Sequence, residues 1–477
     1  MTWLRRLAVL LLCFVALLLA ARWVLTPPAP LALPEQGLVL RSVMLVVPGE
    51  GTAGPVDLTV QGSRIHTVTP STGDAITGYV LPALTDAHMH DPMLPFPREA
   101  EIYTFLHLYH GVTLARMAAG GTTMRDAIAA GHYPGPRMKT CGPFLDGEPP
   151  LWPSSLVVTD SKTAEAAVAE VAAEGYDCVK VYNELTADAS EAIYRAAKAR
   201  SLPVIGHVPW RQDATAAFID DQQHSLGLPP PPTEADEAYA FAMLRMQDVT
   251  PARIEALTKA LRASDTALTP TLITLERKAR YKGTPSKAAV NNATLLPRYY
   301  REGLWHAERG LVSTRLFDSD DIASFNAALP VAYRAVRTLH ERGVRLHTGT
   351  DAPAEAIAPG AGLIEELHLL RETGISTEDV LGLSAVQSAR DIFGSDYGRL
   401  DAGAPAEFVV YSANPVDDLA NLSTRTAVVS DGRLYKREAL DAQLARYREW
   451  YDSAPYRWLS GNIVGAGLWL INRASGE

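Results

Sequence analysis

Leu81-Pro-Ala-Leu-Thr-Asp-Ala-His-Met-His-Asp91 is a short apolar run that ends in two histidines separated by one residue. Because successive side chains of a strand point to opposite faces, His88 and His90 would lie on one face and Met89 on the other. Two imidazoles on one face can bind one metal ion, although two ordinary surface histidines would give the same pattern. The rest of the chain has to decide between these two interpretations.

Beyond this run, apolar strand-like segments alternate with helical segments, which is the pattern of a parallel α/β architecture. The eight expected strands cover residues 79–87, 111–118, 137–144, 178–182, 203–208, 221–226, 267–272 and 344–350. A typical connecting helix is expected at 186–200, where Thr186 offers an N-cap and Pro203 follows the end. The pattern predicts an α/β fold with a (β/α)8 TIM barrel over residues 81–396, whose active site lies at the C-terminal ends of the strands.

Strand-and-turn segments flank the barrel on both sides. Residues 38–80 contain several short alternating runs, and residues 397–436 contain a matching set. The first set is too small to stand alone. We therefore predict one small β-sandwich domain formed from both ends of the barrel region.

The ends of the expected strands carry side chains that can bind metal. These candidates are His88 and His90 after the first strand, Lys180 in the fourth, His207 in the fifth, His224 in the sixth and Asp351 in the eighth. Each one alone is explained as well by an ordinary core histidine, a helix N-cap or a lysine at a strand edge. Four histidines and an aspartate at one barrel mouth favour a metal site. Lys180 is the exception, because an ammonium group there would repel metal cations.

The same six residues, in this order on these strands, resemble the amidohydrolase superfamily of metal-dependent hydrolases over residues 38–435. The chain resembles in particular the imidazolonepropionase-like branch that includes Xaa-Pro dipeptidases. This resemblance lies in Ala129-Ala-Gly-His-Tyr-Pro-Gly-Pro-Arg137, Val179-Lys-Val-Tyr182, and His347-Thr-Gly-Thr-Asp-Ala352 with Glu365-Glu366 after it. Two departures are Gln223, where relatives often carry an acidic residue, and Ala115-Arg-Met117, where an Arg-Asp pair is common.

The resemblance implies that Lys180 is carboxylated by CO2 and that its carbamate bridges two divalent metal ions. An anion then replaces the cation that was hard to explain. His88, His90 and Asp351 would bind one ion, and His207 and His224 would bind the other. We expect zinc, because imidazole ligands suit it.

The resemblance implies hydrolysis of C–N amide bonds, with Xaa-Pro-like dipeptides as the expected substrates. Metal binding lowers the pKa of water to about 7, so a hydroxide that bridges the two ions would attack the scissile carbonyl. Asp351 is the expected general base, and it would later pass the proton to the leaving nitrogen. Hydrolysis of a cyclic amide or a lactone is the alternative reaction, and a membrane-associated binding protein without catalysis is the alternative function.

Two further side chains are candidates for substrate binding. Tyr182 shares a face with Lys180 and could bond the substrate carbonyl, and Arg116 could meet a substrate carboxylate. A core tyrosine and a surface arginine explain these two residues equally well. His347 lies one layer below Asp351, so we expect it to support the site or the core rather than to bind metal.

Residues 1–25 are expected to lie outside the fold, as a signal peptide or an N-terminal membrane anchor. Two arginines precede an uncharged apolar run, and three leucines at 17–19 stand where signal-peptide cleavage favours a small residue. Trp3 and Trp23 bracket the run at about the 30 Å thickness of a hydrocarbon core, which favours an anchor. Either alternative exports the body to a periplasmic or extracellular face. Residues 26–37 are predicted to form a Pro-rich extended linker.

The remaining features concern partners. The net charge of -10 argues against nucleic acid, and an oligomer is compatible with the sequence. Three cysteines cannot form a disulfide framework. Cys13 lies in the apolar run, so only Cys141 and Cys178 could pair, and we expect them to be two buried free thiols instead. Residues 437–477 form an aromatic-rich tail that would lie on the membrane beside the anchor or pack on the barrel.

Overall fold

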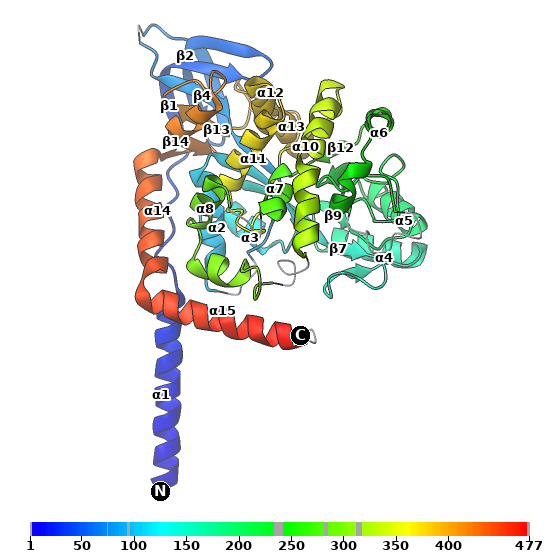
Figure 1. Cartoon of the computed structure of the whole chain (residues 1–477). Helices are drawn as coiled ribbons and strands as arrows, with labels where there is room; N and C mark the ends of the chain where they lie inside the picture. The colour runs from blue at the N-terminus through cyan, green and yellow to red at the C-terminus, as the bar shows by residue number, and fades with distance from the viewer. Residues whose placement is uncertain are drawn as a thin grey trace.

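The computed structural model describes residues 2–73, 75–92, 96–232, 242–280, 285–311 and 317–474. A curved parallel sheet lies at its centre, surrounded by helices, and a second sheet covers one end (Figure 1). The central sheet has the order β12 (Ala267–Thr269), β11 (Asp221–Gln223), β10 (Val204–Gly206), β9 (Cys178–Val181), β7 (Arg137–Asp146), β6 (Val112–Ala119) and β5 (Leu84–His90). The short β8 (Leu156–Val157) pairs with β7 outside this path.

The barrel closes through a segment that has only isolated bridges. Within residues 344–352, all of which are described, Leu346 bridges to Leu268 of β12 and Ala352 bridges to Met89 of β5. The predicted TIM barrel is therefore confirmed, but its eighth strand is not a regular one. The first expected strand, 79–87, also differs, because it divides into β4 (Gly78–Pro82), which belongs to the second sheet, and β5.

Helices connect the strands and form the outer layer. They are α2 (Glu99–Tyr109), α3 (Thr123–Ala129), α4 (Ser161–Ala173), α5 (Ala187–Lys198), α6 (Pro251–Ala263), α7 (Leu272–Arg280), α8 (Lys287–Ala293), α10 (Ser319–Glu341), α11 (Ala361–Glu372), α12 (Thr377–Gly382) and α13 (Ser388–Phe393). Shorter helical turns are η2 (Ala242–Asp248), η3 (Tyr300–Leu304), η4 (Leu383–Gln387) and η5 (Leu419–Thr424). The expected helix at 186–200 is α5, and the Thr186 hydroxyl accepts a hydrogen bond from the Ala189 N–H as the predicted N-cap.

Strand β9 shows how the alternation of side chains builds the site. Val179 and Val181 belong to the main hydrophobic core, together with the inner faces of α4 and α5. Lys180 points to the opposite side, and Cys178 packs there against Ala118 and other apolar side chains of the barrel interior. The period of two along a strand therefore carries Lys180 into the barrel.

The second sheet is assembled from both ends of the barrel region, as predicted. Its order is β15 (Arg433–Lys436), β14 (Arg425–Ser430), β13 (Phe408–Tyr411), β4, β1 (Leu38–Val47), β2 (Gly51–Gln61) and β3 (Arg64–Pro70). The pairing of β4 with β13, with Val80 opposite Val410, joins the two halves. Val80, Val410, Leu58 and Phe408 are part of a separate apolar core.

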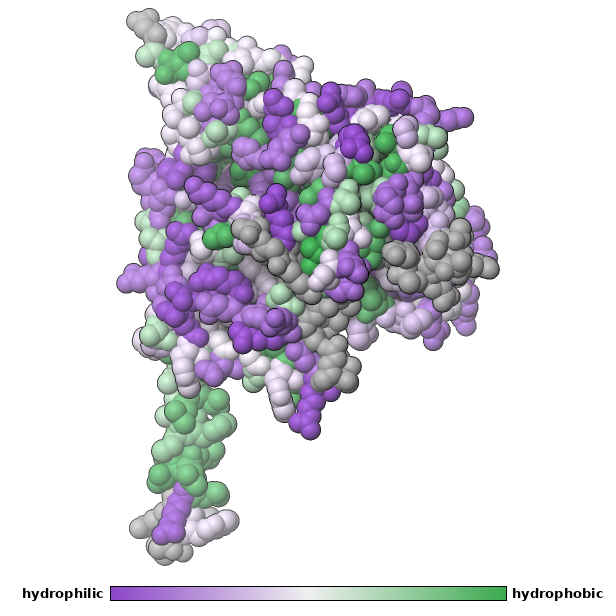
Figure 2. All heavy atoms as spheres, in the orientation of Figure 1, coloured by the Kyte–Doolittle hydropathy of each residue, from purple (hydrophilic) through white to green (hydrophobic). Residues whose placement is uncertain are grey.

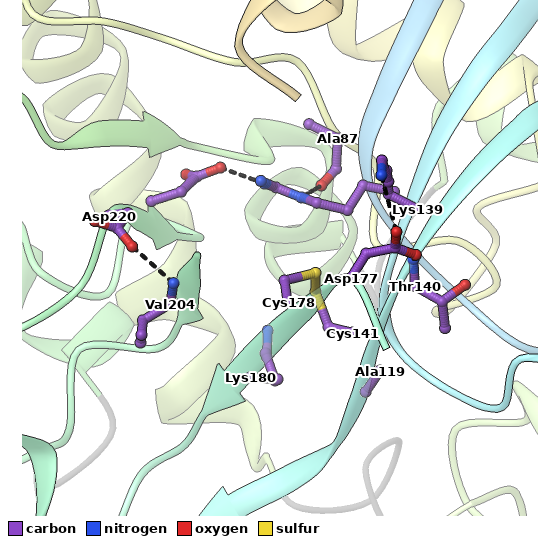
Figure 3. Close-up of a disulfide and its surroundings, with 12 residues drawn as sticks. Ala87, Ala119, Lys139, Thr140, Cys141, Asp177, Cys178, Lys180, Val204 and Asp220 are labelled. Carbon is purple, nitrogen blue, oxygen red and sulfur yellow. Dashed lines mark hydrogen bonds and ion pairs between the residues drawn. A yellow bond between two sulfur atoms is a disulfide. The ribbon is translucent and has the colours of Figure 1, made fainter. Parts of the chain in front are cut away.

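The expectation of two free thiols is wrong, because Cys141 and Cys178 form a disulfide. These residues lie opposite each other on the neighbouring strands β7 and β9, so their Cα atoms are 4.4 Å apart (Figure 3). This distance lies at the short end of the range that a disulfide can bridge. The pairing depends on the register of two strands that are separated by β8 and α4 in the sequence.

The N-terminal and C-terminal helices meet at the end of the molecule opposite the second sheet (Figure 1). Helix α1 (Thr2–Leu25) projects away from the body, and its projecting part is hydrophobic on the surface (Figures 1 and 2). The C-terminal tail forms α14 (Arg437–Asp452) and α15 (Ala454–Ala474), and α15 crosses the base of α1 (Figure 1).

Candidate metal centre

Three predicted ligand atoms meet at the C-terminal end of β5. The Nε2 atoms of His88 and His90 are 3.1 Å apart, and Oδ1 of Asp351 lies 3.1 Å from the first and 3.0 Å from the second. Ligands around one tetrahedral zinc ion, each about 2 Å from it, are spaced about 3.3 Å apart. The three atoms are therefore arranged as they would be around a single ion.

The other two histidines continue the same group. The ring of His224 lies with its centroid 4.5 Å from that of His88 and 4.8 Å from that of His207. One ligand atom from each of His88, His224 and Asp351 can be chosen so that all three lie within 4.8 Å of one another. The barrel thus brings all four histidines and the aspartate to one place.

Neighbouring groups orient three of these imidazoles. Nδ1 of His207 donates to Oδ1 of Asn183 at 2.7 Å, and Nδ1 of His224 pairs with the Thr271 hydroxyl at 2.7 Å. Nδ1 of His90 lies 3.3 Å from the carbonyl oxygen of Ala119. A partner at Nδ1 fixes the tautomer and leaves the Nε2 lone pair for a metal ion.

Burial favours the neutral form of three of the imidazoles, those of His88, His207 and His224. Burial, and then the positive charge of Lys180, lower the pKa of both His88 and His207 well below the usual value. Burial lowers the pKa of His224 to about 3. Burial alone would raise the pKa of Asp351, but His224 and the hydrogen bonds from His88 and His90 hold it well below its usual value. A neutral imidazole and an ionised carboxylate are the protonation states that bind metal ions.

Lys180 lies fully buried among these ligands, beside the disulfide and on the same strand as Cys178 (Figure 3). Its amine donates to Oε1 of Gln223. Burial lowers the pKa of Lys180 to about 7, so much of the amine is neutral near neutral pH. The amide nitrogen of Gln223 is buried and has no hydrogen-bond partner among the described residues.

Two of the ligand residues have a strained backbone. His224 has φ 60° and Asp351 has φ 65°, and neither residue is glycine. This left-handed conformation costs about 1 kcal/mol or more per residue and persists only where surrounding contacts hold it. At Asp351 one such contact is the bond from its N–H to the carbonyl oxygen of His88, at 2.7 Å. Both strained residues are thus candidate metal ligands, His224 and Asp351.

The two predicted substrate contacts have different places. Tyr182 lies beside the site, with its ring 4.2 Å from that of His207, and its hydroxyl accepts a hydrogen bond from the Trp152 indole at 3.1 Å. Arg116 does not reach the opening. It is only 5% exposed, and its guanidinium pairs with Asp221 and donates to the carbonyl oxygen of Ala87. Its charge is therefore engaged inside the barrel, and nothing in this arrangement supports contact with a substrate carboxylate.

Sequence reasoning missed two carboxylates that hold the site together. Asp86 accepts hydrogen bonds from the Thr350 hydroxyl at 2.8 Å and from the His88 N–H at 3.1 Å. It shares a face with His88 and His90 in an otherwise apolar run, which could have identified it. Asp221 accepts a hydrogen bond from Nδ1 of His347 at 2.9 Å and forms an ion pair with Arg116. His347 therefore supports the site from the layer below it, as expected.

Comparison with known proteins agrees with this geometry. The amidohydrolase family matches residues 79–435, and no curated protein sequence matches the chain. The structure is similar to bottromycin amidohydrolase, with a TM-score of 0.70 and 24% identity over 91% of this chain and 94% of that one. It is also similar to an Xaa-Pro dipeptidase with bound methionine (TM-score 0.62, 16% identity, 84% and 100% coverage). A prolidase complexed with N-methylphosphonate-L-proline has a TM-score of 0.60 (17% identity, 84% and 99% coverage). The chain belongs to the amidohydrolase family and is a metal-dependent hydrolase.

Proposed function

We propose that this chain cleaves the C–N amide bond of dipeptides at a binuclear metal centre, with Xaa-Pro-like compounds as the substrate class. The observation that carries the proposal is the spacing of 3.0–3.1 Å among the ligand atoms of His88, His90 and Asp351. The family supports amide chemistry. The structural likeness to an Xaa-Pro dipeptidase and a prolidase is the reason for choosing dipeptides.

The donor set fits two divalent ions, with zinc expected. His88, His90 and Asp351 would hold one ion and His207 and His224 the other, and the bound ions would activate water and polarise the scissile carbonyl. A carbamate on Lys180 would lie between them. The buried, unpartnered amide nitrogen of Gln223 fits that group. If the Gln223 amide rotated so that its oxygen and nitrogen exchanged places, the nitrogen would donate a hydrogen bond to a carbamate oxygen.

Asp351 is placed to move the proton. Its side chain and that of His90 are partly exposed, at 23% and 25%, whereas His88 is fully buried. The carboxylate therefore lies at the open side of the group, where it can accept a proton from the attacking water and return it to the leaving nitrogen. Tyr182, whose ring centroid lies 4.2 Å from that of His207, would contact the substrate beside this carboxylate.

We infer that the body of the protein is exported. Arg6–Leu25 is long and apolar enough to cross a membrane, and its large apolar side chains from Leu7 to Leu19 are exposed. The disulfide supports this inference independently, because such bonds persist in oxidising compartments.

The first experiment measures the metal and the carbamate directly. Metal-saturated protein is expected to contain two divalent ions per chain, and 13C-bicarbonate is expected to give a carbamate NMR resonance. Lys180→Ala should lose that resonance and the bridged pair of ions. Lys139→Ala is the matched control, because this lysine of the neighbouring strand β7 pairs with Asp177 at 2.8 Å and is 40% exposed. One ion or none in fully active protein would contradict the binuclear centre.

The second experiment separates the hydrolase from a binding protein. A dipeptide library identifies the best substrate, and Asp351→Asn should then lower kcat by about 10²-fold or more while KM changes much less. Asp188→Asn, at an exposed position on α5, is the control. Equal kcat values with both metals bound would remove Asp351 as the base. Absence of wild-type turnover on every amide, lactone and ester would favour the binding protein.

A further inference from the structure

The C-terminal helix α15 has apolar side chains on both faces. Its inner face packs on η3, and the buried residues recur every four positions: Tyr456, Ser460, Val464 and Leu468. Its outer face is also apolar, with exposed fractions of 70% for Trp458, 57% for Trp469 and 60% for Leu470. Ile463 adds to this face. A helix in water normally turns polar side chains outward, so this surface calls for an apolar partner.

The position of α15 relative to α1 identifies the environment of that face. The indole of Trp450 donates to the carbonyl oxygen of Val24 at 3.0 Å, and the amide of Gln443 donates to that of Ala29 at 3.0 Å. These contacts fix the body end of α1 to the C-terminal helices, and α15 runs across it (Figure 1). If α1 crosses a bilayer, α15 lies at the level where the bilayer meets water. Tryptophan favours this level, and Trp23 at the end of α1 is 80% exposed.

A groove of about 810 Å³ runs between α15 and η3. Its floor includes Val464 and Leu468, and a Cβ atom added at Gly461 or Gly465 would meet nothing within 4 Å, so there is room along the helix backbone. The basic residues around this apolar floor are Arg298, Arg309 and Arg457, and Glu302 is the acidic one among the described lining residues. Three arginines at one apolar groove are notable in a chain of net charge -10.

The arginines are weakly neutralised. Arg298 forms long ion pairs with Asp452 at 3.5 Å and with Glu302 at 3.7 Å. Arg457 is exposed at the rim of the groove, and its side chain forms no ion pair with the described residues. An apolar trough with cationic groups along its edge matches an acyl chain and a phosphate.

We propose that α15 lies in the membrane interface and that the groove between α15 and η3 binds an anionic phospholipid. The acyl chain occupies the trough over Gly461 and Gly465, and the phosphate contacts Arg298, Arg309 and Arg457. The partner is thus the surface of an anionic bilayer. This proposal goes beyond the hydrolase function and does not depend on the substrate.

The contacts of α15 also indicate which end of the barrel faces the membrane. Gly303 of η3 lies against α15, since a Cβ atom there would be 3.1 Å from Val464. Two residues later the indole of Trp305 donates to the carbonyl oxygen of Pro353 at 3.0 Å, close to Asp351. On the β5 side, Arg98 donates to the carbonyl oxygen of Pro27 at 3.3 Å, just beyond α1. The rim of the barrel next to the metal site therefore lies on the membrane side.

Fluorescence quenching by brominated lipids tests this placement on the full chain reconstituted in vesicles. The vesicles contain phosphatidylcholine and phosphatidylglycerol, and one of the two lipids carries bromine in its acyl chains. The contribution of Trp458 is the quenching that is lost in Trp458→Phe. We expect Trp458 to be quenched, and to be quenched at about tenfold lower mole fraction by the brominated anionic lipid than by the neutral one.

The variant R298Q/R309Q/R457Q tests the groove. It should keep the quenching of Trp458 but lose the tenfold preference for phosphatidylglycerol. R195Q/R262Q/R334Q changes the net charge equally on exposed positions of α5, α6 and α10, and should keep the preference. Metal content and circular dichroism confirm that both variants are folded.

Each other outcome overturns the proposal. No quenching of Trp458 by either lipid would place α15 in water. Equal quenching by both lipids in the wild type, or loss of preference in both triple variants, would remove the anionic site. A dimer in detergent that dissociates on substitution of Trp458 and Trp469, with no lipid quenching, would show that a second copy of the chain covers this face.

Discussion

Replacing Cys141 and Cys178 by alanine is expected to lower the free energy of unfolding by about 4 kcal/mol. The disulfide links residues 37 positions apart, and the loss of loop-closure entropy in the unfolded chain for a loop of this length amounts to about 4 kcal/mol. Alanine is suitable at both positions, because their neighbours Ala118 and Ile205 are apolar. Little native packing energy should therefore change, and the effect lies mainly in the unfolded state.

The assay is guanidinium-induced unfolding in detergent, with Cys13→Ala as the control. Cys13 is exposed on α1, so its replacement should leave the unfolding free energy unchanged. Thiol titration of unreduced, denatured wild-type protein should find one free thiol. Three titratable thiols would show that the disulfide is not formed. A double variant as stable as the wild type, with one free thiol in the latter, would refute the entropic argument itself.

Three other predictions concern pH, the carbamate and the metal. Burial lowers the pKa of His107 to about 3, and the unfolded value is about 6.5. The unfolded chain binds the extra proton between these values, so stability should fall by up to about 5 kcal/mol as the pH drops through this window. His107→Phe should reduce the fall of the unfolding free energy with pH, measured by unfolding curves at a series of pH values. An unchanged pH dependence in the variant would show that His107 is not its cause. Gln223→Leu removes the donor next to Lys180, so the 13C carbamate resonance should weaken while the fold is kept; full intensity would exclude this contact. Removal of metal by a chelator should lower the free energy of unfolding by about 4 kcal/mol if the ion was present at a thousand times its Kd, and calorimetry of apo and reloaded protein would detect it.

The barrel and the meeting of its polar side chains could be predicted because they depend on local patterns. The period of two along a strand is enough to put His88 and His90 on one face and to turn Lys180 away from Val179 and Val181. The rule that parallel strands end at a common rim then collects residues that are far apart in the sequence. This prediction requires only the position at which each strand ends, and the apolar runs indicate that position.

Features that depend on contacts between distant strands could not be predicted. The disulfide requires the register of β7 against β9, which no single segment encodes. Arg116 turns inward because Asp221, on the non-neighbouring strand β11, faces it across the closed barrel. The segment at 344–350 has the composition of a strand and completes the ring through backbone hydrogen bonds, such as Leu268 N–H to the Arg345 carbonyl at 2.9 Å and Ala87 N–H to the Thr348 carbonyl at 2.7 Å. Its pairing with β12 and β5 is nevertheless limited to isolated bridges, so it is not a regular strand.

The second sheet has a consequence for synthesis of the protein. Gln36, just before β1, hydrogen-bonds to Asp431, which lies 395 residues later in the chain. At about 5–20 residues per second, the N-terminal strands wait roughly 20 to 80 s on the ribosome for their partners. During that time β4 is an uncovered edge that can pair with other chains. Slow translation or premature termination before β13 should therefore favour aggregation, and chaperones that bind exposed strands should be found on the nascent chain during this interval.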